Sequence, residues 1–138
     1  GLTELGAVPR YVGARLGSVT TVDGDEIDVE VTLETMPSVL FDAVAVVGGK
    51  DAVVELGNVG HALEFIKDQY RHAKPILALA EGADLVENAG AAAMLPSGQP
   101  DPGMIVDRKA TADAALPRFV KAIARHRHHE REMDPPPV

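Results

Sequence analysis

The sequence predicts an α/β domain in which a largely parallel sheet lies between two layers of helices. Short apolar runs that suit buried strands alternate along the chain with segments of helical periodicity. One run, from Ala43 to Val47, is continuously apolar and rich in valine, as is typical of a strand covered on both faces. The length of 138 residues suits one domain with one core. We assign the domain to residues 1–133 and expect the Pro-rich tail, 134–138, to be disordered.

The residues before this central strand favour small, peripheral elements. Leu2 to Leu5 suits the last turn of a helix closed by Gly6. A short strand is expected around residues 11–12, at a sheet edge because Pro9 has no N–H group to donate. Alternating residues on both sides of Asp23-Gly24, a pair that suits tight turns, predict a β-hairpin. Three apolar side chains share one face of its second arm: Val29, Val31 and Leu33.

The middle of the chain predicts a strand followed by an amphipathic helix. The strand Ala43 to Val47 ends at Gly48-Gly49, and Asp51 is placed to cap the helical segment that follows. The helix ends near Ala73, because the proline of Lys74-Pro75 disfavours helical geometry in the residue before it. Its apolar positions at helical spacing are Val59, Ala62, Leu63, Ile66 and Tyr70.

The last part of the chain predicts two more helices and three short strands. A strand from Ile76 to Leu79 leads into a helix from about Gly82 to Asn88. Ala91 to Leu95 and Met104 to Val106 are strand candidates on either side of a Pro/Gly loop. The C-terminal helix either begins at Pro117 or is kinked there, because an interior proline loses a hydrogen bond. Its apolar face consists of Leu116, Phe119, Val120 and Ile123.

The composition excludes several classes of function. The chain has no cysteine, so disulfides, thiolate metal sites and a thiol nucleophile are excluded. Only three Phe, two Tyr and no Trp are present, which disfavours a stacking site for flavin or bases. The net charge of −8 opposes nucleic-acid binding, which depends on clustered Lys and Arg. We expect a cytoplasmic protein, because no apolar run approaches the roughly 20 residues of a membrane span and no signal sequence is recognisable.

The stretch KPILALAEGADL predicts a strand, a sharp turn and a helix, an arrangement that holds the nucleophile in many α/β enzymes. Ligands of open parallel sheets bind beyond the carboxyl ends of the strands, so this turn and Gly48-Gly49 form the candidate site. Ala80 at the bend cannot act as a nucleophile. Glu81 could act as a general base or a covalent nucleophile. We favour a structural role for Glu81, because the helix dipole alone favours an acid there and no partner residue is identifiable.

A weaker pattern concerns metal binding. On a continuous helix, His126, His129 and Glu130 would share one face and could present three ligands. We favour an exposed, charged helix end, where cations meet the negative pole of the helix dipole, and expect no metal site. His61 and His72 are interpreted as surface residues. No phosphate loop and no dinucleotide-binding fingerprint occurs.

Three separated blocks carry a resemblance to a known family: PSVLFDAVAVVGG, HALEFIKDQYRHAKPILALAEGADLVENAG and VKAIARHRHHERE. In this order and spacing they resemble the C-terminal domain of the large-subunit haem catalases, over about Leu2 to Met133. That domain is similar to the type 1 glutamine amidotransferase-like superfamily, which includes intracellular proteases, deglycase-like proteins and a parkinsonism-associated chaperone. The resemblance implies a flavodoxin-like, three-layer α/β/α fold with a mainly parallel sheet.

The resemblance also implies a degenerate active site. Active members of the superfamily carry a Cys two residues before the glycine that opens the helix; here the glycine is Gly82 and the matching position is Ala80. The glycine pair after the preceding strand is retained as Gly48 and Gly49. The first strand of such folds is central in the sheet, and this chain is expected to begin after it. Because unpaired buried backbone groups are costly, we expect an upstream segment or another chain to complete the sheet.

By this resemblance the domain is a non-catalytic accessory part of a catalase, which decomposes hydrogen peroxide at a haem in its core domain. The domain itself would hold no cofactor. The implied partners are the catalase core and the other subunits of a homotetramer, with a stabilising or chaperone-like role, and neither nucleic acid nor a membrane. Two alternatives stay open: hydrolase or lyase chemistry on small carbonyl compounds through Glu81, and anion binding at the N–H groups of Gly49 or Gly82.

Overall fold

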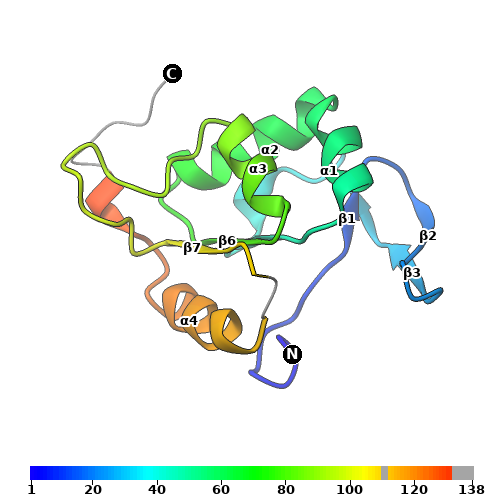
Figure 1. The fold of residues 1–138 in the computed structure, drawn as a ribbon, viewed down its shortest axis with the longest axis horizontal. Helices are drawn as coiled ribbons and strands as arrows, with labels where there is room; N and C mark the ends of the chain where they lie inside the picture. The colour runs from blue at the N-terminus through cyan, green and yellow to red at the C-terminus, as the bar shows by residue number, and fades with distance from the viewer. Residues whose placement is uncertain (110–111, 132–138) are drawn as a thin grey trace.

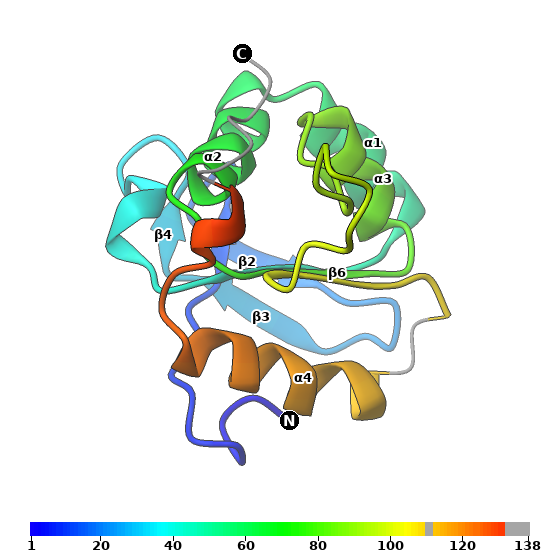
Figure 2. The ribbon, with the colours of Figure 1, turned by 90° about the vertical axis from the view of Figure 1, so that its left-hand side faces the viewer.

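The computed structural model describes residues 1–109 and 112–131, so the tail predicted to be disordered, 134–138, lies outside the described residues. A central sheet carries helices on both of its faces (Figure 1). Viewed along the sheet, α1, α2 and α3 lie on one side and α4 lies on the other (Figure 2). The predicted three-layer α/β architecture is therefore confirmed. Within the described ranges, no helix is long and apolar enough to cross a membrane.

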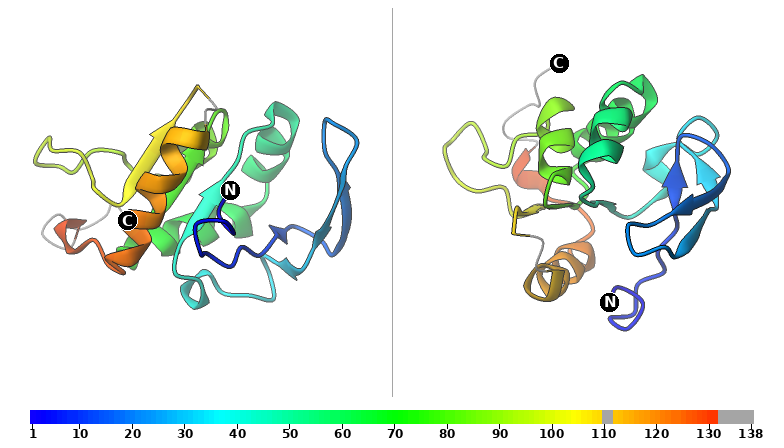
Figure 3. Two further views of the ribbon diagram at one scale, coloured as in Figure 1. Left: turned by 90° about the horizontal axis from the view of Figure 1, so that it is seen from below. Right: turned by 45° about the vertical axis from the view of Figure 1, so that its right-hand side comes forward.

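Three parallel strands form the central sheet in the order β5-β6-β7. Each was predicted as a strand, and β7 extends one residue beyond its predicted end at Val106. Their bounds are Val44–Val46 for β5, Ile76–Leu79 for β6 and Met104–Asp107 for β7. Ile76 pairs with Val44 on one side and with Met104 on the other. Seen from below, α4 crosses the underside of these strands (Figure 3). All three strands end at the same edge of the sheet, as parallel strands must.

Two helices connect β5 to β6, where the sequence predicted one amphipathic helix. They are α1 (Lys50–Gly57) and α2 (Gly60–Arg71). Asn58 caps the end of α1, and its side-chain amide donates back to the Val54 carbonyl at 3.0 Å. Asp51 lies in the first turn of α1, but the helix is capped by Gly49 and no side chain caps it, so the predicted cap is wrong. The buried face of α2 confirms the predicted amphipathicity.

The segments after β6 confirm one predicted helix, correct one predicted strand and exclude one of the two alternatives for the last helix. Helix α3 (Gly82–Asn88) has the predicted bounds. Residues 91–95 do not form a strand; the pairing there is an isolated bridge between Met94 and Pro100, because the Pro/Gly loop turns straight back. Helix α4 (Ala112–Ala124) continues through Pro117, so it does not begin at that residue.

The N-terminal elements lie beside the sheet. A hydrogen-bonded turn at residues 2–6 ends at Gly6 with a φ of 86°, as the helix-end pattern predicted. Two short strands, β1 (Val12–Gly13) and β4 (Val31–Thr32), pair in parallel. The predicted hairpin consists of β2 (Gly17–Thr20) and β3 (Glu26–Val29), and it projects from the body of the molecule (Figures 1 and 3). Its turn places Gly24 at a φ of 90°, which a glycine tolerates.

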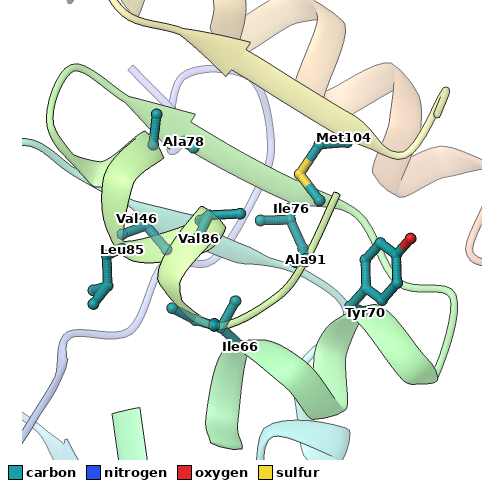
Figure 4. Packing of buried hydrophobic residues seen from close by; sticks show 11 residues of the cluster. Val46, Ile66, Tyr70, Ile76, Ala78, Leu85, Val86, Ala91 and Met104 are labelled. Carbon is teal, nitrogen blue, oxygen red and sulfur yellow. The ribbon is translucent and has the colours of Figure 1, made fainter. Parts of the chain in front are cut away.

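The hydrophobic core is divided by the sheet into two clusters. Ile76 and Ala78 of β6 face α2 and α3, whereas Leu77 between them faces α4, as the two-residue period of a strand requires. Figure 4 shows the first cluster, where Ile66 and Val86 of the covering helices point toward β6. Burying each large aliphatic side chain of this kind contributes about 1.5–3 kcal/mol. Much of the stability therefore comes from the two faces of one strand.

The segment that leads into β5 is fastened to the end of α2. A short 3₁₀ turn, η1 (Ser38–Leu40), precedes the strand. The side-chain amide of Gln69 donates to the Ser38 carbonyl, and the ammonium of Lys74 donates to the carbonyls of Val39 and Phe41. Burial lowers the pKa of Lys74. These bonds hold the start of β5 against β6.

A buried ion pair fastens the C-terminal residues to the amino ends of the strands. The guanidinium of Arg131 and the carboxylate of Asp101 are 2% and 0% exposed and lie in direct contact. Arg131 also donates to the Lys74 carbonyl at 2.8 Å, and its cation lies 4.6 Å from the centre of the Tyr70 ring. Asp101 accepts the N–H of Gly103, just before β7, at 2.8 Å. Removing one member of such a pair costs about 3–5 kcal/mol, so this contact holds residues 129–131 in place.

His128 is packed beneath this ion pair. Its ring is fully buried, and its Nε2 lies 3.1 Å from the Ala122 carbonyl. A Cβ on Gly103 would stand only 2.6 Å from the ring atoms Cγ and Cδ2 of His128. Burial lowers the pKa of the imidazole, and the charges of Arg125 and Arg131 lower it further, against the opposing Ala122 carbonyl and Asp101 carboxylate. His128 is therefore neutral in the folded protein. The sequence interpretation of this segment as an exposed helix end is wrong at this residue.

We expect His128 to make the domain acid-sensitive. The unfolded chain takes up a proton near a pH of about 6.5, whereas the folded chain does so only at lower pH, so stability must fall as pH drops below that value. Urea unfolding at pH 7.5 and pH 5.5 measures the loss. The substitution His128→Gln retains a donor to Ala122 but cannot titrate, so its stability should fall less over this interval. An equal fall in both proteins would contradict the expectation.

Candidate functional site

The candidate site lies where β5 and β6 end, at the carboxyl edge of the sheet. Ala80 follows β6 and adopts a left-handed backbone conformation with a φ of 48°. Its N–H donates to the carbonyl of Asp107 at 2.8 Å, and α3 begins two residues later. An L-residue in this conformation costs about 1–2 kcal/mol. The sharp turn that raises a nucleophile in related folds is therefore formed here around a methyl group.

Two glycines allow this turn to pack against the end of β5. A Cβ on Gly82 would lie 2.4 Å from the carbonyl oxygen of Val46, closer than any real contact. A Cβ on Gly48 would lie 2.7 Å from the Cβ of Ala80 and 2.7 Å from a carboxylate oxygen of Glu81. The turn and the end of β5 are thus in direct backbone contact. This geometry brings together the residues predicted for the site.

Glu81 bridges the two loops of the site. Its Oε2 accepts the N–H of Gly49, the residue that caps α1, at 3.1 Å. Hydrogen bonds from its own N–H and from the N–H of Gly49 lower the pKa of the carboxyl. A carboxylate stabilised in this way is a weaker base and nucleophile than a free one. The contact thus favours the structural interpretation of Glu81 over catalysis.

Arg108 borders the site at the end of β7. Its guanidinium forms ion pairs with Asp84 and Glu87 on α3, both at 2.6 Å. All three side chains are half-exposed or more, so solvent screens both pairs and each stabilises the fold only weakly. Arg108 therefore holds α3 beside β7 and is already bonded to two carboxylates.

The histidine pattern does not form a metal site. The turn after α4 takes His126 to a φ of 61°, so His126, His129 and Glu130 do not share a helix face as they would on a continuous helix. Throughout the described part of the chain, no group of three or more His, Asp and Glu side chains could hold a metal ion. Glu130 is paired with Arg125 at 2.8 Å. His61 and His72 are exposed, as predicted.

Two cavities that the sequence analysis did not find lie beside β5. Their volumes are about 420 Å³ and 160 Å³. Phe65 lines both, and Phe119 lines the first. No periodicity in the sequence marks these cavities, because the walls of each come from segments that are far apart along the chain. Within residues 1–109 and 112–131, no His, Tyr, Met or Ser lines either cavity.

We expect Gly82→Ala to destabilise the protein by about 1–3 kcal/mol, because the added methyl group must displace the end of β5. Chemical denaturation measures the change. Gly60→Ala is the matched control: it also lies at the first position of a helix, and its Cβ would meet no atom within 4 Å. The control should leave stability unchanged or slightly increase it, by up to about 1 kcal/mol. A Gly82→Ala protein as stable as the control would show that the turn is not tightly packed.

We expect inorganic phosphate not to bind at Gly49, because the carboxylate of Glu81 already accepts its N–H and would repel a second anion. Thermal unfolding with and without millimolar phosphate tests this, since a ligand of the folded state raises the melting temperature. Sodium chloride at equal ionic strength is the control. A rise in melting temperature specific to phosphate would revive the anion-binding alternative.

Comparison with known proteins agrees with this geometry. The family model for the C-terminal domain found in long catalases matches residues 1–133. Catalase HPII of Mycobacterium avium is 35% identical over 128 residues, which cover 88% of this chain and 18% of that catalase. Catalase-2 of Bacillus subtilis is 32% identical over 134 residues, which cover 96% of this chain and 18% of that catalase. The chain therefore spans less than a fifth of the length of these relatives.

Solved structures share the fold at low sequence identity. A ThiJ/PfpI domain protein from Brachyspira murdochii superposes with a TM-score of 0.75 at 14% identity, over 89% of this chain and 83% of that one. A ThiJ/PfpI family protein from Pseudomonas syringae gives a TM-score of 0.62 at 20% identity, over 91% of this chain and 63% of that one. These likenesses confirm the flavodoxin-like fold. The family match over residues 1–133 shows that the chain belongs to the family of C-terminal domains found in long catalases.

Proposed function

We propose that this chain is a non-catalytic accessory domain of a large-subunit catalase, and that it stabilises the assembled enzyme. The relatives that support this proposal are catalases, and the chain matches less than a fifth of their length. Peroxide decomposition is accordingly assigned to the haem-containing core of the parent protein. The partners of the domain are that core and the neighbouring subunits of a homotetramer, in the cytoplasm.

The observation that carries the proposal is the elbow without a nucleophile. Ala80 occupies the sharp turn, and the nearest candidate for a replacement, Glu81, has its carboxylate bonded to Gly49. The turn is nevertheless packed closely against β5 through Gly48 and Gly82. A structure that retains the backbone of a reactive site without its reactive side chain is better suited to packing than to chemistry.

The residues of this domain do not fit haem. Haem iron is held by His, Cys, Met or Tyr side chains, and among the described residues none of these lines either cavity beside β5. His128 is buried, but its Nε2 lies against the Ala122 carbonyl and its ring is packed on Gly103. The ring of Tyr70 is buried under Arg131. We therefore derive no peroxide chemistry from this domain.

A chaperone-like activity is the finer part of the proposal. It is supported by large apolar side chains that are more than half exposed on the N-terminal segment and hairpin: Val8, Tyr11, Leu16, Val19 and Val22. Such side chains could contact the core, another subunit or an unfolded polypeptide. Hydrolase or lyase chemistry through Glu81 is less favoured, because hydrogen bonds from backbone N–H groups lower the pKa of its carboxyl and weaken it as a base.

We expect removal of this domain from the full-length catalase to leave peroxide turnover per haem nearly unchanged at 25 °C and to accelerate thermal inactivation. The domain contributes contacts rather than reacting groups, so its loss should change stability and not chemistry. Peroxide assays and sedimentation, before and after heating, measure both effects.

A matched control retains the domain but disrupts its fold. In the full-length protein, Asp101→Asn leaves the buried Arg131 cation without its counter-charge, so it should accelerate inactivation in the same direction as removal. Peroxide turnover by the isolated 138-residue chain, or equal heat resistance of the truncated and intact enzymes, would overturn the proposal.

A further inference from the structure

The hairpin formed by β2 and β3 leaves one uncharged strand edge open. In the part of the chain that the structure describes, β2 pairs with β3 alone, and the hairpin projects from the body of the molecule (Figure 3). All four residues of β2 are exposed. Glu26 and Asp28 lie in β3, whereas β2 contains neither a charged residue nor a proline. Charges and proline protect a strand edge against further pairing, so β3 is protected and β2 is not.

Two residues of β2 direct their backbone hydrogen-bonding groups outward. Just beyond β2, the N–H of Thr21 donates across the hairpin to the Asp25 carbonyl at 2.8 Å. Residues of an antiparallel ladder alternate between facing the partner strand and facing away from it. Val19 therefore faces β3 as Thr21 does, and Ser18 and Thr20 direct their N–H and C=O groups away from it. Because a two-stranded hairpin alone is only marginally stable in water, a further strand at this edge would stabilise it.

An antiparallel second copy of β2 would satisfy these groups with its two-fold axis beside Val19. Val19 then lies opposite its counterpart as a non-hydrogen-bonded pair, in which side chains approach most closely. Ser18 lies opposite Thr20 of the second copy, and these two residues exchange a pair of hydrogen bonds. The result is one continuous sheet in the order β3-β2-β2-β3, which keeps the acidic strands at its outer edges.

The same register gives partners to the exposed apolar side chains of the hairpin. Leu16, Val19 and Val22 are all more than half exposed. In this register Val19 contacts its counterpart, and Leu16 comes beside Val22 of the second copy. Arg15 and Asp23 meet at the two ends of the segment, so opposite charges come together. A shift by two residues in either direction would separate both apolar pairs, so the side chains select this register.

We propose that β2 is an interface strand, which pairs with β2 of a second copy of this chain about a two-fold axis at Val19. The presence of the second copy rests on the proposed function, in which the domain contacts neighbouring subunits, whereas the register follows from the hairpin itself. Such an interface uses the same surface on both copies and closes on itself, so it adds no third copy at this edge.

A cysteine at the axis tests the pairing, because this chain has no cysteine of its own. In the full-length protein, Val19→Cys should form a disulfide between two copies, since the Cα atoms of such a pair lie about 4.5 Å apart. The matched control is Glu26→Cys, which is also exposed but lies at the outer edge of the proposed sheet, too far from its counterpart to link.

Non-reducing electrophoresis after mild oxidation measures the linked dimer, and the unsubstituted full-length protein gives the background. Val19→Cys should yield at least about 10-fold more linked dimer than Glu26→Cys, because only the first position meets the distance that a disulfide requires. Equal yields from the two variants, or no linked dimer from either, would overturn the proposal.

A second pair of variants tests the backbone bonds. In the full-length protein that carries Val19→Cys, Thr20→Pro removes an outward N–H and should lower the yield of linked dimer at least about 10-fold, although an edge strand itself tolerates proline. Thr20→Ser retains the N–H and should leave the yield unchanged. Equal yields from Thr20→Pro and Thr20→Ser would contradict the inference.

Hydrogen exchange separates a second copy from the parent's core as the occupant of this edge. In the unsubstituted full-length protein, the amides of Ser18 and Thr20 should be protected. Protection without a link through Val19→Cys would assign the edge to the core and refute the pairing. The proposed function has a separate readout: faster thermal inactivation on removal of the domain, without any linked dimer, would support that function and overturn the pairing alone.

Discussion

The close approach of Gly82 to the Val46 carbonyl is the constraint on which the rest of the candidate site depends. The beginning of α3 lies against the backbone of β5, and a side chain at this position would stand 2.4 Å from the carbonyl oxygen. The chain must therefore turn within two residues of β6, and the left-handed φ of 48° at Ala80 achieves this. The same turn brings Glu81 within hydrogen-bonding distance of Gly49. One backbone contact thus positions the turn, the helix and the carboxylate.

Local patterns in the sequence predicted the elements that carry this site. The apolar run of β6 and the glycine that opens α3 lie close together in the sequence. The predicted bounds of both elements match the observed ones. The sequence also predicted that Ala80 stands at the bend between β6 and α3. The bond from Gly49 to Glu81 was not predicted, because it joins residues 32 positions apart and depends on how two loops meet.

The buried C-terminal segment could not be predicted for the same reason. Its charged composition suits an exposed helix end, and its burial depends on distant contacts of Arg131, above all the ion pair with Asp101, 30 residues away. The break between α1 and α2 was missed because Asn58 ends the first helix through bonds to its own last turn. The expected strand at 91–95 failed because the loop that follows returns too soon to leave a partner within reach.

These contacts also divide the sheet into parts of different stability. At the amino ends of β6 and β7, the Arg131–Asp101 pair joins segments from both strands to the C-terminal residues. At the carboxyl ends, backbone contact joins α3 to β5. Along its outer edge, β5 has apolar hollows on both sides instead of packed side chains. Local opening of the domain should therefore begin at β5, since opening starts where buried contacts are fewest.

A strained turn is not by itself a sign of catalysis in this fold. The conformation of Ala80 costs about 1–2 kcal/mol. This is a modest part of the free energy of unfolding of a typical domain, about 5–15 kcal/mol. The contacts around Gly48 and Gly82 join β5, β6 and α3, and relaxing the turn would separate these elements. The packing offsets the strain whether or not a nucleophile stands at the bend. In this domain, packing alone therefore maintains the turn, and the turn does not depend on a reactive side chain at position 80.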